Sequence, residues 1–204
     1  MIKRSLIALL AVLGVAAVAA AEAPPTALLL ACSACHGARG EGLAALGAPA
    51  LAGQNADYLA RQLRNFSLGQ RGYAAQDHAG ATMRGVAATL DAAAQTQLAT
   101  YYGQLPAVTR VLAPAADLAQ GQALYQQTCA ACHGQQAQGY GQLHAPNLRL
   151  LDGRYIRLQL ASYVQGWRSD ETHGDIQGLW MRSIASHIRA PDELSAVIGY
   201  IERQ

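Results

Sequence analysis

The fold is decided by two pentapeptides, CSACH at 32–36 and CAACH at 129–133. Both follow the pattern C-x-x-C-H, and together they contain all four cysteines of the chain. This spacing is the attachment signature of c-type haem, because two thiols three positions apart reach both vinyl groups on one porphyrin edge while the next imidazole meets the iron. The sequence therefore predicts two covalent c-type haems, bound through Cys32 and Cys35 and through Cys129 and Cys132, with His36 and His133 as proximal ligands.

Other uses of paired cysteines fit this spacing less well. A ribbon-type zinc site separates its two cysteine pairs by about 15–20 residues, whereas 93 residues lie between Cys35 and Cys129. A thioredoxin-type redox pair does not require a histidine after each pair, and it needs a βαβ pattern nearby. A disulfide within each pair would close a very tight loop. Haem attachment is the interpretation that accounts for both pentapeptides.

The pentapeptides anchor an internal repeat with an offset of 97 residues. After the pentapeptides, the first copy continues with Pro49, Leu51, Tyr58, Gln62, Leu63, Gly69 and Arg71, and the second with Pro146, Leu148, Tyr155, Gln159, Leu160, Gly166 and Arg168. Such a repeat predicts two similar domains in tandem. Each is too small to build a large apolar core unaided, and a buried haem would supply the missing apolar mass.

Methionine supplies the expected sixth iron ligands. Apart from the initiator, the chain has only Met83 and Met181, which lie 47 and 48 residues after His36 and His133. The alternative, methionine as flexible core filler, does not predict one methionine at the equivalent place in each repeat. Because His and Met form a recognised axial pair of c-type cytochromes, we predict Met83 on the first iron and Met181 on the second. Thioether ligation raises the reduction potential.

Four histidines lie outside the pentapeptides. His78 and His173 precede the two methionines by five and eight residues and compete with them for the sixth position. Their Gly-rich, polar surroundings favour surface loops instead. His144 and His187 have no counterpart in the other repeat, so we expect them to be exposed or locally hydrogen-bonded.

The hydrophobic periodicity is helical. Apolar side chains at helical spacing predict a middle helix in each repeat, starting near Tyr58 and near Tyr155. Each repeat also ends in a helix, for which Asp91 and Pro191 are the N-terminal signals. A helix precedes each pentapeptide, and the first of these is much the shorter. Since no β alternation of useful length occurs, the expected fold is all-α.

The N-terminus resembles a secretory signal. Lys3 and Arg4 give a positive start, positions 6–18 are uncharged and mostly apolar, and small-x-small cleavage sites follow. The apolar run is short for a membrane span, which needs about 20 residues, and an uncleaved anchor is the alternative. We therefore expect a periplasmic protein. The expected divisions are a signal peptide at 1–23, an N-terminal domain at 24–109, a linker at 110–116 and a C-terminal domain at 117–204.

Composition argues against two broad classes. With 51% hydrophobic and 14% charged residues, the chain is globular rather than disordered. Its formal net charge of +2 includes no basic run, which argues against a nucleic-acid partner.

These motifs together resemble the dihaem cytochromes of the cytochrome c-4 family. Besides the pentapeptides, PALAGQ at 49–54 runs into YLxxQLxxFxxGxR at 58–71, and a late methionine precedes a helix containing LATY at 98–101. The second half departs from the pattern, with LRLLDG at 148–153. The resemblance implies two tandem class I cytochrome c domains, each wrapped around one covalent c-type haem. By matching motif, it assigns haem one to Cys32, Cys35, His36 and Met83, and haem two to Cys129, Cys132, His133 and Met181.

A class I domain usually crosses its first and last helices through a glycine and an aromatic residue. Gly121 and Tyr125 fit that role with Tyr200 in the second repeat. The first repeat has Pro24 and Leu28 at the corresponding positions. Its terminal helices are therefore expected to pack less tightly, or to place Leu28 against Tyr101 or Tyr102.

Two six-coordinate haems indicate electron transfer rather than catalysis, because they leave no open site for a substrate. The family implies a periplasmic carrier that takes single electrons from a quinol-oxidising complex or a dehydrogenase and passes them to a terminal oxidase or reductase. Such partners, or an uncleaved anchor, would attach it to the membrane. The alternative is a cytochrome subunit of a periplasmic dehydrogenase complex, for sulfide or alcohol. A third hypothesis is an enzyme, such as a dihaem peroxidase or thiosulfate dehydrogenase, in which one haem has His, Cys or an open position in place of methionine. Two equivalent methionines, and the absence of a further cysteine in the sequence, argue against it.

Overall fold

The computed structural model describes residues 23–108, 117–188 and 190–204. Residues 1–22 of the expected signal and the whole expected linker lie outside these ranges. The first half contains α1 (Thr26–His36), η1 (Ala44–Leu46), α2 (Ala56–Ser67), α3 (His78–Ala87) and α4 (Ala92–Gln104). The second half contains α5 (Leu118–Thr128), α6 (Ala130–His133), η2 (Gly141–Leu143), η3 (Leu148–Leu150), α7 (Gly153–Val164), α8 (Ile176–Ala185) and α9 (Pro191–Ile201).

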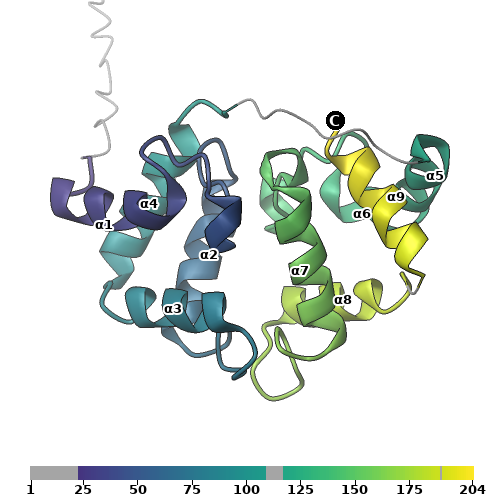
Figure 1. Cartoon of the computed structure of the whole chain (residues 1–204). Coiled ribbons are helices and arrows are strands. Elements are labelled where there is room, and N and C mark those ends of the chain that lie inside the picture. Colours follow the sequence, from purple (N-terminus) through teal and green to yellow (C-terminus); the bar gives the residue numbers. More distant parts are fainter. Residues whose placement is uncertain (1–22, 109–116, 189) are drawn as a thin grey trace, which may run out of the picture.

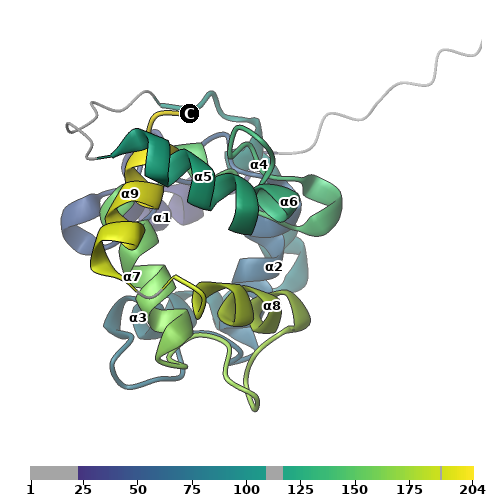
Figure 2. The same ribbon diagram turned by 90° about the vertical axis from the view of Figure 1, so that its right-hand side faces the viewer.

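The all-α expectation is confirmed. Over the described ranges the backbone forms no strand, only the isolated bridges Leu43–Ala48 and Tyr140–Ala145, which occupy equivalent places in the two repeats. None of the helices in those ranges has the length and apolar character that a bilayer span requires. The two halves lie side by side, with α2 and α7 facing each other across the middle (Figure 1). Seen from the side, α8 lies below α5 and α6 (Figure 2).

Short polar side chains start most of the helices by accepting hydrogen bonds from otherwise unpaired backbone N–H groups. Asp91 caps α4 by accepting from the Ala94 N–H at 2.8 Å, as predicted. Pro191 occupies the first turn of α9, also as predicted. Asp77 and Asp175 cap α3 and α8 in the same way. Helices α3 and α8 carry Met83 and Met181. The sequence analysis did not predict these two helices.

The second half crosses its terminal helices closely. A Cβ atom placed on Gly121 of α5 would collide with the Ala196 carbonyl of α9. The ring of Tyr125, which is completely buried, lies 5.3 Å from the ring of Tyr200 between centroids. The expectation for Gly121, Tyr125 and Tyr200 is confirmed, and the glycine is required because the two backbones meet there.

The first half is built differently. Its α1 runs without a break through the first pentapeptide, so it is longer than predicted. In the second half the helix is interrupted at Cys129, which lies between α5 and α6. In place of a close α1–α4 crossing, the main packing joins α2 to α4. Leu28 packs against a buried cluster that includes Tyr102, and Tyr101 packs against the same cluster. Both parts of the expectation for this domain are therefore confirmed.

Candidate haem sites and the domain interface

One cavity of the N-terminal half brings together the first predicted ligand set. It has a volume of about 340 Å³, and its lining includes Cys32, Cys35, His36 and Met83. Most of the remaining wall is apolar, and its residues come from α2, α3, α4 and the segment 46–54. The other half completes the wall with Leu151, Tyr155 and Gln159. The four residues thus meet on one largely apolar cavity, which is the environment that a porphyrin needs.

Each of the two predicted proximal histidines is buried and oriented by a backbone carbonyl. The Nδ1 atom of His36 lies 2.8 Å from the Pro49 oxygen, and that of His133 lies 3.2 Å from the Pro146 oxygen. When Nδ1 donates its proton to the carbonyl, Nε2 keeps a free lone pair, the usual arrangement of metal-binding histidines. Burial lowers the pKa of both imidazoles and so favours the neutral form that binds iron.

The second ligand set occupies the equivalent elements of the C-terminal half. His133 ends α6 as His36 ends α1, and Met181 is the sixth residue of α8 as Met83 is of α3. Helix α8 packs against α7, just as α3 packs against α2. Both methionines are half-buried. In both pentapeptides the first cysteine is half-buried, the second exposed and the histidine buried.

The state of the cysteines disfavours the zinc and redox alternatives. No disulfide joins any two of the four cysteines. Burial raises the pKa of Cys32, and it raises that of Cys129 to about 12. Disulfide exchange needs the thiolate, which a raised pKa disfavours. No cluster of three or more His, Cys, Asp or Glu side chains within the described ranges is arranged to hold a metal ion.

Two arginines at equivalent positions of the repeat join the halves. Arg71 donates to Gln62 of its own half at 2.7 Å, and to Tyr155 and Gln159 of the other half at 2.9 Å each. Arg168 donates to Gln159 of its own half at 2.6 Å and to Gln62 of the other at 3.0 Å. Each guanidinium is therefore shared by both halves.

Both arginines are buried, with exposed fractions of only 7% and 5%. The guanidinium of Arg71 lies 4.5 Å above the Phe66 ring centroid, and that of Arg168 lies at the same distance above Tyr163. All the hydrogen-bond partners recorded for them in the described ranges are neutral, and the Nε atom of Arg71 is buried with none. A buried charge is costly unless an opposite charge compensates it, so this interface requires an anion.

These residues fit a c-type haem. Its macrocycle is apolar, as is most of the cavity wall, and its propionates are carboxylates of the kind that buried arginines lack here. Arg71 itself lines the cavity. The local field is also positive. Burial would raise the pKa of Tyr58, yet Arg168, Arg71 and Arg61 together lower it below the ordinary value.

Further polar contacts fix the two halves relative to each other. The amide of Gln54, 1% exposed, donates to the Asn147 carbonyl at 3.0 Å and accepts from the Asn147 N–H at 2.7 Å. The Tyr73 hydroxyl donates to the Gly166 carbonyl at 2.8 Å and accepts from the Asp170 N–H at 2.9 Å. Because these hydrogen bonds cross the interface between buried or half-buried groups, they hold the two halves in one relative placement.

The competing histidines have other surroundings. His78 is exposed at the start of α3, so it lies in a helix rather than in the expected loop. His173 lies outside the helices, as expected, but its ring stacks on Tyr73 with 4.0 Å between centroids. Its Nδ1 atom lies 2.9 Å from a carboxylate oxygen of Asp170. His78 is not among the residues that line the cavity of the first site, and the His173 ring is held by Tyr73 and Asp170.

The two histidines without a counterpart differ from each other. His187 is exposed, with Nδ1 2.9 Å from the Ser183 carbonyl oxygen, as expected. His144 was also expected to be exposed or locally hydrogen-bonded, and this is wrong. It is half-buried with a left-handed φ of 50°, and its Nδ1 atom is buried without a recorded partner.

The sequence reasoning missed the interface residues, although their signal was present. Gln62 with Gln159, and Arg71 with Arg168, were among the matched positions of the repeat. Matching alone did not reveal that they meet each other. Gln54 had no such signal, because the second repeat has Leu151 at its position.

Comparison with known proteins also indicates two cytochrome c domains in tandem. The family model described as "Cytochrome c" matches residues 22–105 and 118–204. A thiosulfate dehydrogenase electron acceptor from Thiomonas intermedia is 36% identical over 82% of this chain and 77% of its own. Cytochrome c4 from Acidithiobacillus ferrooxidans superposes with a TM-score of 0.70 at 27% identity, covering 85% of this chain and 98% of its own. A thiosulfate dehydrogenase from Marichromatium purpuratum matches with a TM-score of 0.66 at 31% identity, over 83% of this chain and 35% of its own.

Proposed function

Because the chain belongs to the cytochrome c family, as a dihaem protein of the cytochrome c4 type, we propose that it is a periplasmic carrier of single electrons. The observation that carries this is the cavity on which Cys32, Cys35, His36 and Met83 meet. The repeat places Cys132, His133 and Met181 at equivalent positions of the second half. The expected signal peptide, the domain boundaries and the linker remain part of this proposal.

The proposed ligands follow the repeat. Cys32 and Cys35 form the thioethers of haem one, and His36 and Met83 are its axial ligands. Cys129, Cys132, His133 and Met181 hold haem two in the same roles. When bound, each haem takes up and releases one electron. The chain's own residues fill both axial positions, exclude water with an apolar wall and compensate charge at Arg71 and Arg168.

The proposed donor is a periplasmic dehydrogenase or a quinol-oxidising complex, and the proposed acceptor is a terminal oxidase or reductase. Among donors, a thiosulfate dehydrogenase is the first to test, since a relative similar over most of its length is named as the electron acceptor of that enzyme. Two candidates then differ in their behaviour. A free carrier is isolated alone, whereas a dedicated cytochrome subunit copurifies with its dehydrogenase.

The test is rapid mixing of the oxidised dihaem protein with thiosulfate, with and without a thiosulfate dehydrogenase. We expect two electrons per chain to enter only when the dehydrogenase or another competent donor is present, read as growth of the reduced α band. Thiosulfate oxidation by this protein alone, with an artificial acceptor, would identify it as an enzyme and overturn the carrier proposal. A quinol-oxidising complex is assayed in parallel as the rival donor.

A further inference from the structure

The two methionine helices begin alike but are held differently. Helices α3 and α8 start after Asp77 and Asp175, each accepting from the N–H group three residues later, at 2.9 Å and 2.8 Å. In both helices the methionine is the sixth residue. A cap that fixes the helix start therefore also fixes where the methionine lies along the helix axis.

The cap of α8 is bound by side chains of the other domain. The second carboxylate oxygen of Asp175 accepts hydrogen bonds from the guanidinium of Arg61 and, at 2.7 Å, from the amide of Asn65. Both donors lie on α2 of the N-terminal domain. A further N–H of Arg61 donates to the His144 carbonyl at 3.2 Å. The pair is shielded from solvent, since only 18% of the Arg61 and 15% of the Asp175 side chain are exposed.

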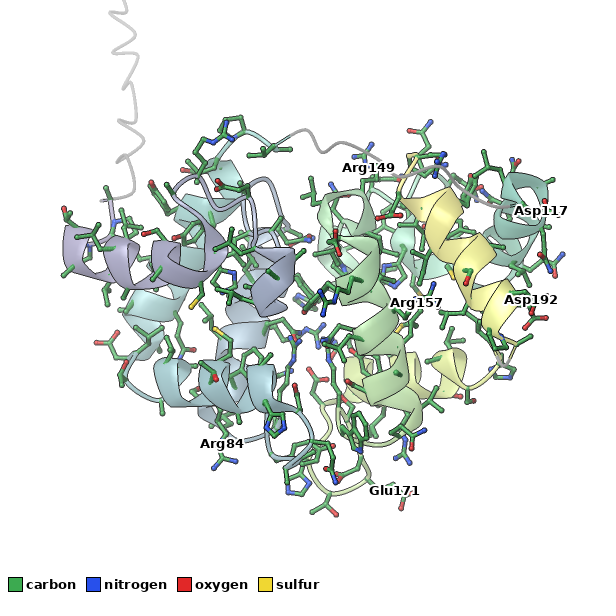
Figure 3. The ribbon with its side chains drawn as sticks, in the orientation of Figure 1. Arg84, Asp117, Arg149, Arg157, Glu171 and Asp192 are labelled. Carbon is green, nitrogen blue, oxygen red and sulfur yellow. The ribbon has the colours of Figure 1, made fainter. Side chains whose placement is uncertain are left out.

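Electrostatics agree with this geometry. Burial alone would raise the pKa of Asp175, but the bonds from Asn65 and Arg61 lower it below the ordinary value. The carboxylate therefore stays ionised, the form that accepts from both donors and from the helix N–H. In Figure 3 side-chain nitrogens gather along the midline between the domains, while labelled charged residues such as Arg84, Glu171 and Asp192 lie at the periphery.

The N-terminal domain binds the cap of α8, but the C-terminal domain makes no equivalent contact, within the described ranges, to the cap of α3. At the repeat offset, Arg61 and Asn65 correspond to Leu158 and Ser162 of α7. Leu158 cannot donate a hydrogen bond, and the Ser162 hydroxyl donates to the Leu158 carbonyl of its own helix at 2.9 Å. In the described ranges, the one donor recorded for the Asp77 carboxylate is the Gly80 N–H of its own helix.

We propose that Arg61 and Asn65 are positioning residues for Met181, so that these two side chains of the N-terminal domain strengthen the sixth-ligand bond of the second haem but not that of the first. This inference rests on the proposed ligation by Met181. Loss of Arg61 frees the start of α8, and the methionine sulfur is then displaced more easily from the iron.

The test uses the oxidised holoprotein and imidazole, which displaces methionine from ferric haem and abolishes the far-red sulfur-to-iron band. To follow one haem at a time, each variant is combined with Met83→His or Met181→His, which leaves one sulfur band. We expect Arg61→Leu, the residue of the second repeat, to lower the imidazole concentration that displaces Met181 about tenfold and leave that for Met83 unchanged. Asn65→Ser is expected to lower the imidazole concentration that displaces Met181 about threefold. Arg61→Lys, which keeps the positive charge, is expected to lower it much less than Arg61→Leu does.

Arg64→Leu is the matched control, because Arg64 lies exposed on the same helix and carries the same charge. Arg64→Leu should leave unchanged the imidazole concentrations that displace Met83 and Met181. An equal change at Met83 and Met181 in Arg61→Leu, or no change at either, would overturn the positioning role. If Arg61→Leu does not fold, the milder Asn65→Ser decides by the same criterion. By contrast, a sulfur band as strong in Met181→His as in wild type would reject Met181 as a ligand, and with it the ligation that this inference presupposes.

Discussion

In the C-terminal domain the first and last helices cross at Gly121, where backbone meets backbone, while the N-terminal domain packs α4 chiefly against α2. Its apolar cluster is also smaller, with five buried residues against nine. What recurs in both domains is the pentapeptide, the carbonyl that orients its histidine, and the aspartate that starts the methionine helix. The comparison indicates that the haem surroundings repeat while the supporting frame varies.

The interface shows the same contrast. Arg71 and Arg168 contact both domains in a nearly symmetric way. Arg61 reaches from the first domain to the second with no counterpart in return. The first domain thus has the less extensive helix packing of its own, but its Arg61 helps to hold the second domain. The following predictions test this difference between the domains.

The largest effect is expected from preventing haem attachment in the first domain with Cys32→Ala and Cys35→Ala. A cavity of about 340 Å³ left open costs about 8 kcal/mol at roughly 24 cal/mol per Å³, similar to the whole stability of a domain, about 5–15 kcal/mol. We expect the N-terminal helices to lose protection in hydrogen exchange. In the matched double variant Cys129→Ala and Cys132→Ala, the C-terminal helices should keep more of their hydrogen-exchange protection. An equal loss of protection in the two double variants would contradict the comparison.

A smaller effect, shared by both haems, is expected from Arg71→Met. Removing a buried positive charge favours the oxidised haem, so both reduction potentials should fall. The expected size is roughly 50 mV, the Coulomb energy of unit charges on the order of 15 Å apart at an effective dielectric constant near 20. Potentiometric titration measures it, with exposed Arg64→Met as the control. A fall at only one haem would show that the arginine is not shared.

The helix crossing is tested by Gly121→Ala. The new methyl group meets the Ala196 carbonyl, and overpacking of this kind costs about 2 kcal/mol of unfolding free energy. Gly85→Ala is the control, since no atom lies within 4 Å of a Cβ placed there. Because alanine favours helix over glycine, the control should be neutral or stabilising in denaturant titration. A neutral Gly121→Ala would mean that the crossing is not tight.

The smallest effect concerns pH. The folded protein lowers the pKa of Asp175, so the ionised carboxylate stabilises the fold above its ordinary pKa of about 3.9. That contribution is lost as pH falls through the lowered folded value. The expected loss is below about 1 kcal/mol, because the 18% of the Arg61 and 15% of the Asp175 side chain that stay exposed let solvent screen the pair. Unfolding free energies near pH 5 and near pH 3 should differ less in Asp175→Asn than in wild type, and an equal difference would exclude the contribution.

Local signals in the sequence predicted much of this molecule. The pentapeptides, the repeat and the helical periodicity were sufficient for an all-α fold with two related halves. Asp91, Pro191 and Gly121 were identified correctly because a cap, a first-turn proline and a backbone crossing each depend on one residue type at one place.

The sequence did not predict contacts that depend on how the halves meet. Arg71 and Gln159 are 88 positions apart, and the pairing of Gln54 with Asn147 joins an amide side chain to a distant backbone. Helices α3 and α8 were also missed, because their glycines and polar residues weaken the periodic signal. Tertiary packing and the aspartate caps stabilise them instead.

The central claim is that both haems have His/Met ligation, through Met83 and Met181. Its most direct test is a spectroelectrochemical titration of the haem-loaded protein that follows the Soret and visible bands together with the far-red sulfur-to-iron band. We predict two haems at positive potential, both showing the sulfur band when oxidised. One haem at markedly low potential without that band would contradict the symmetric ligation and indicate a catalytic or sensing role for that haem.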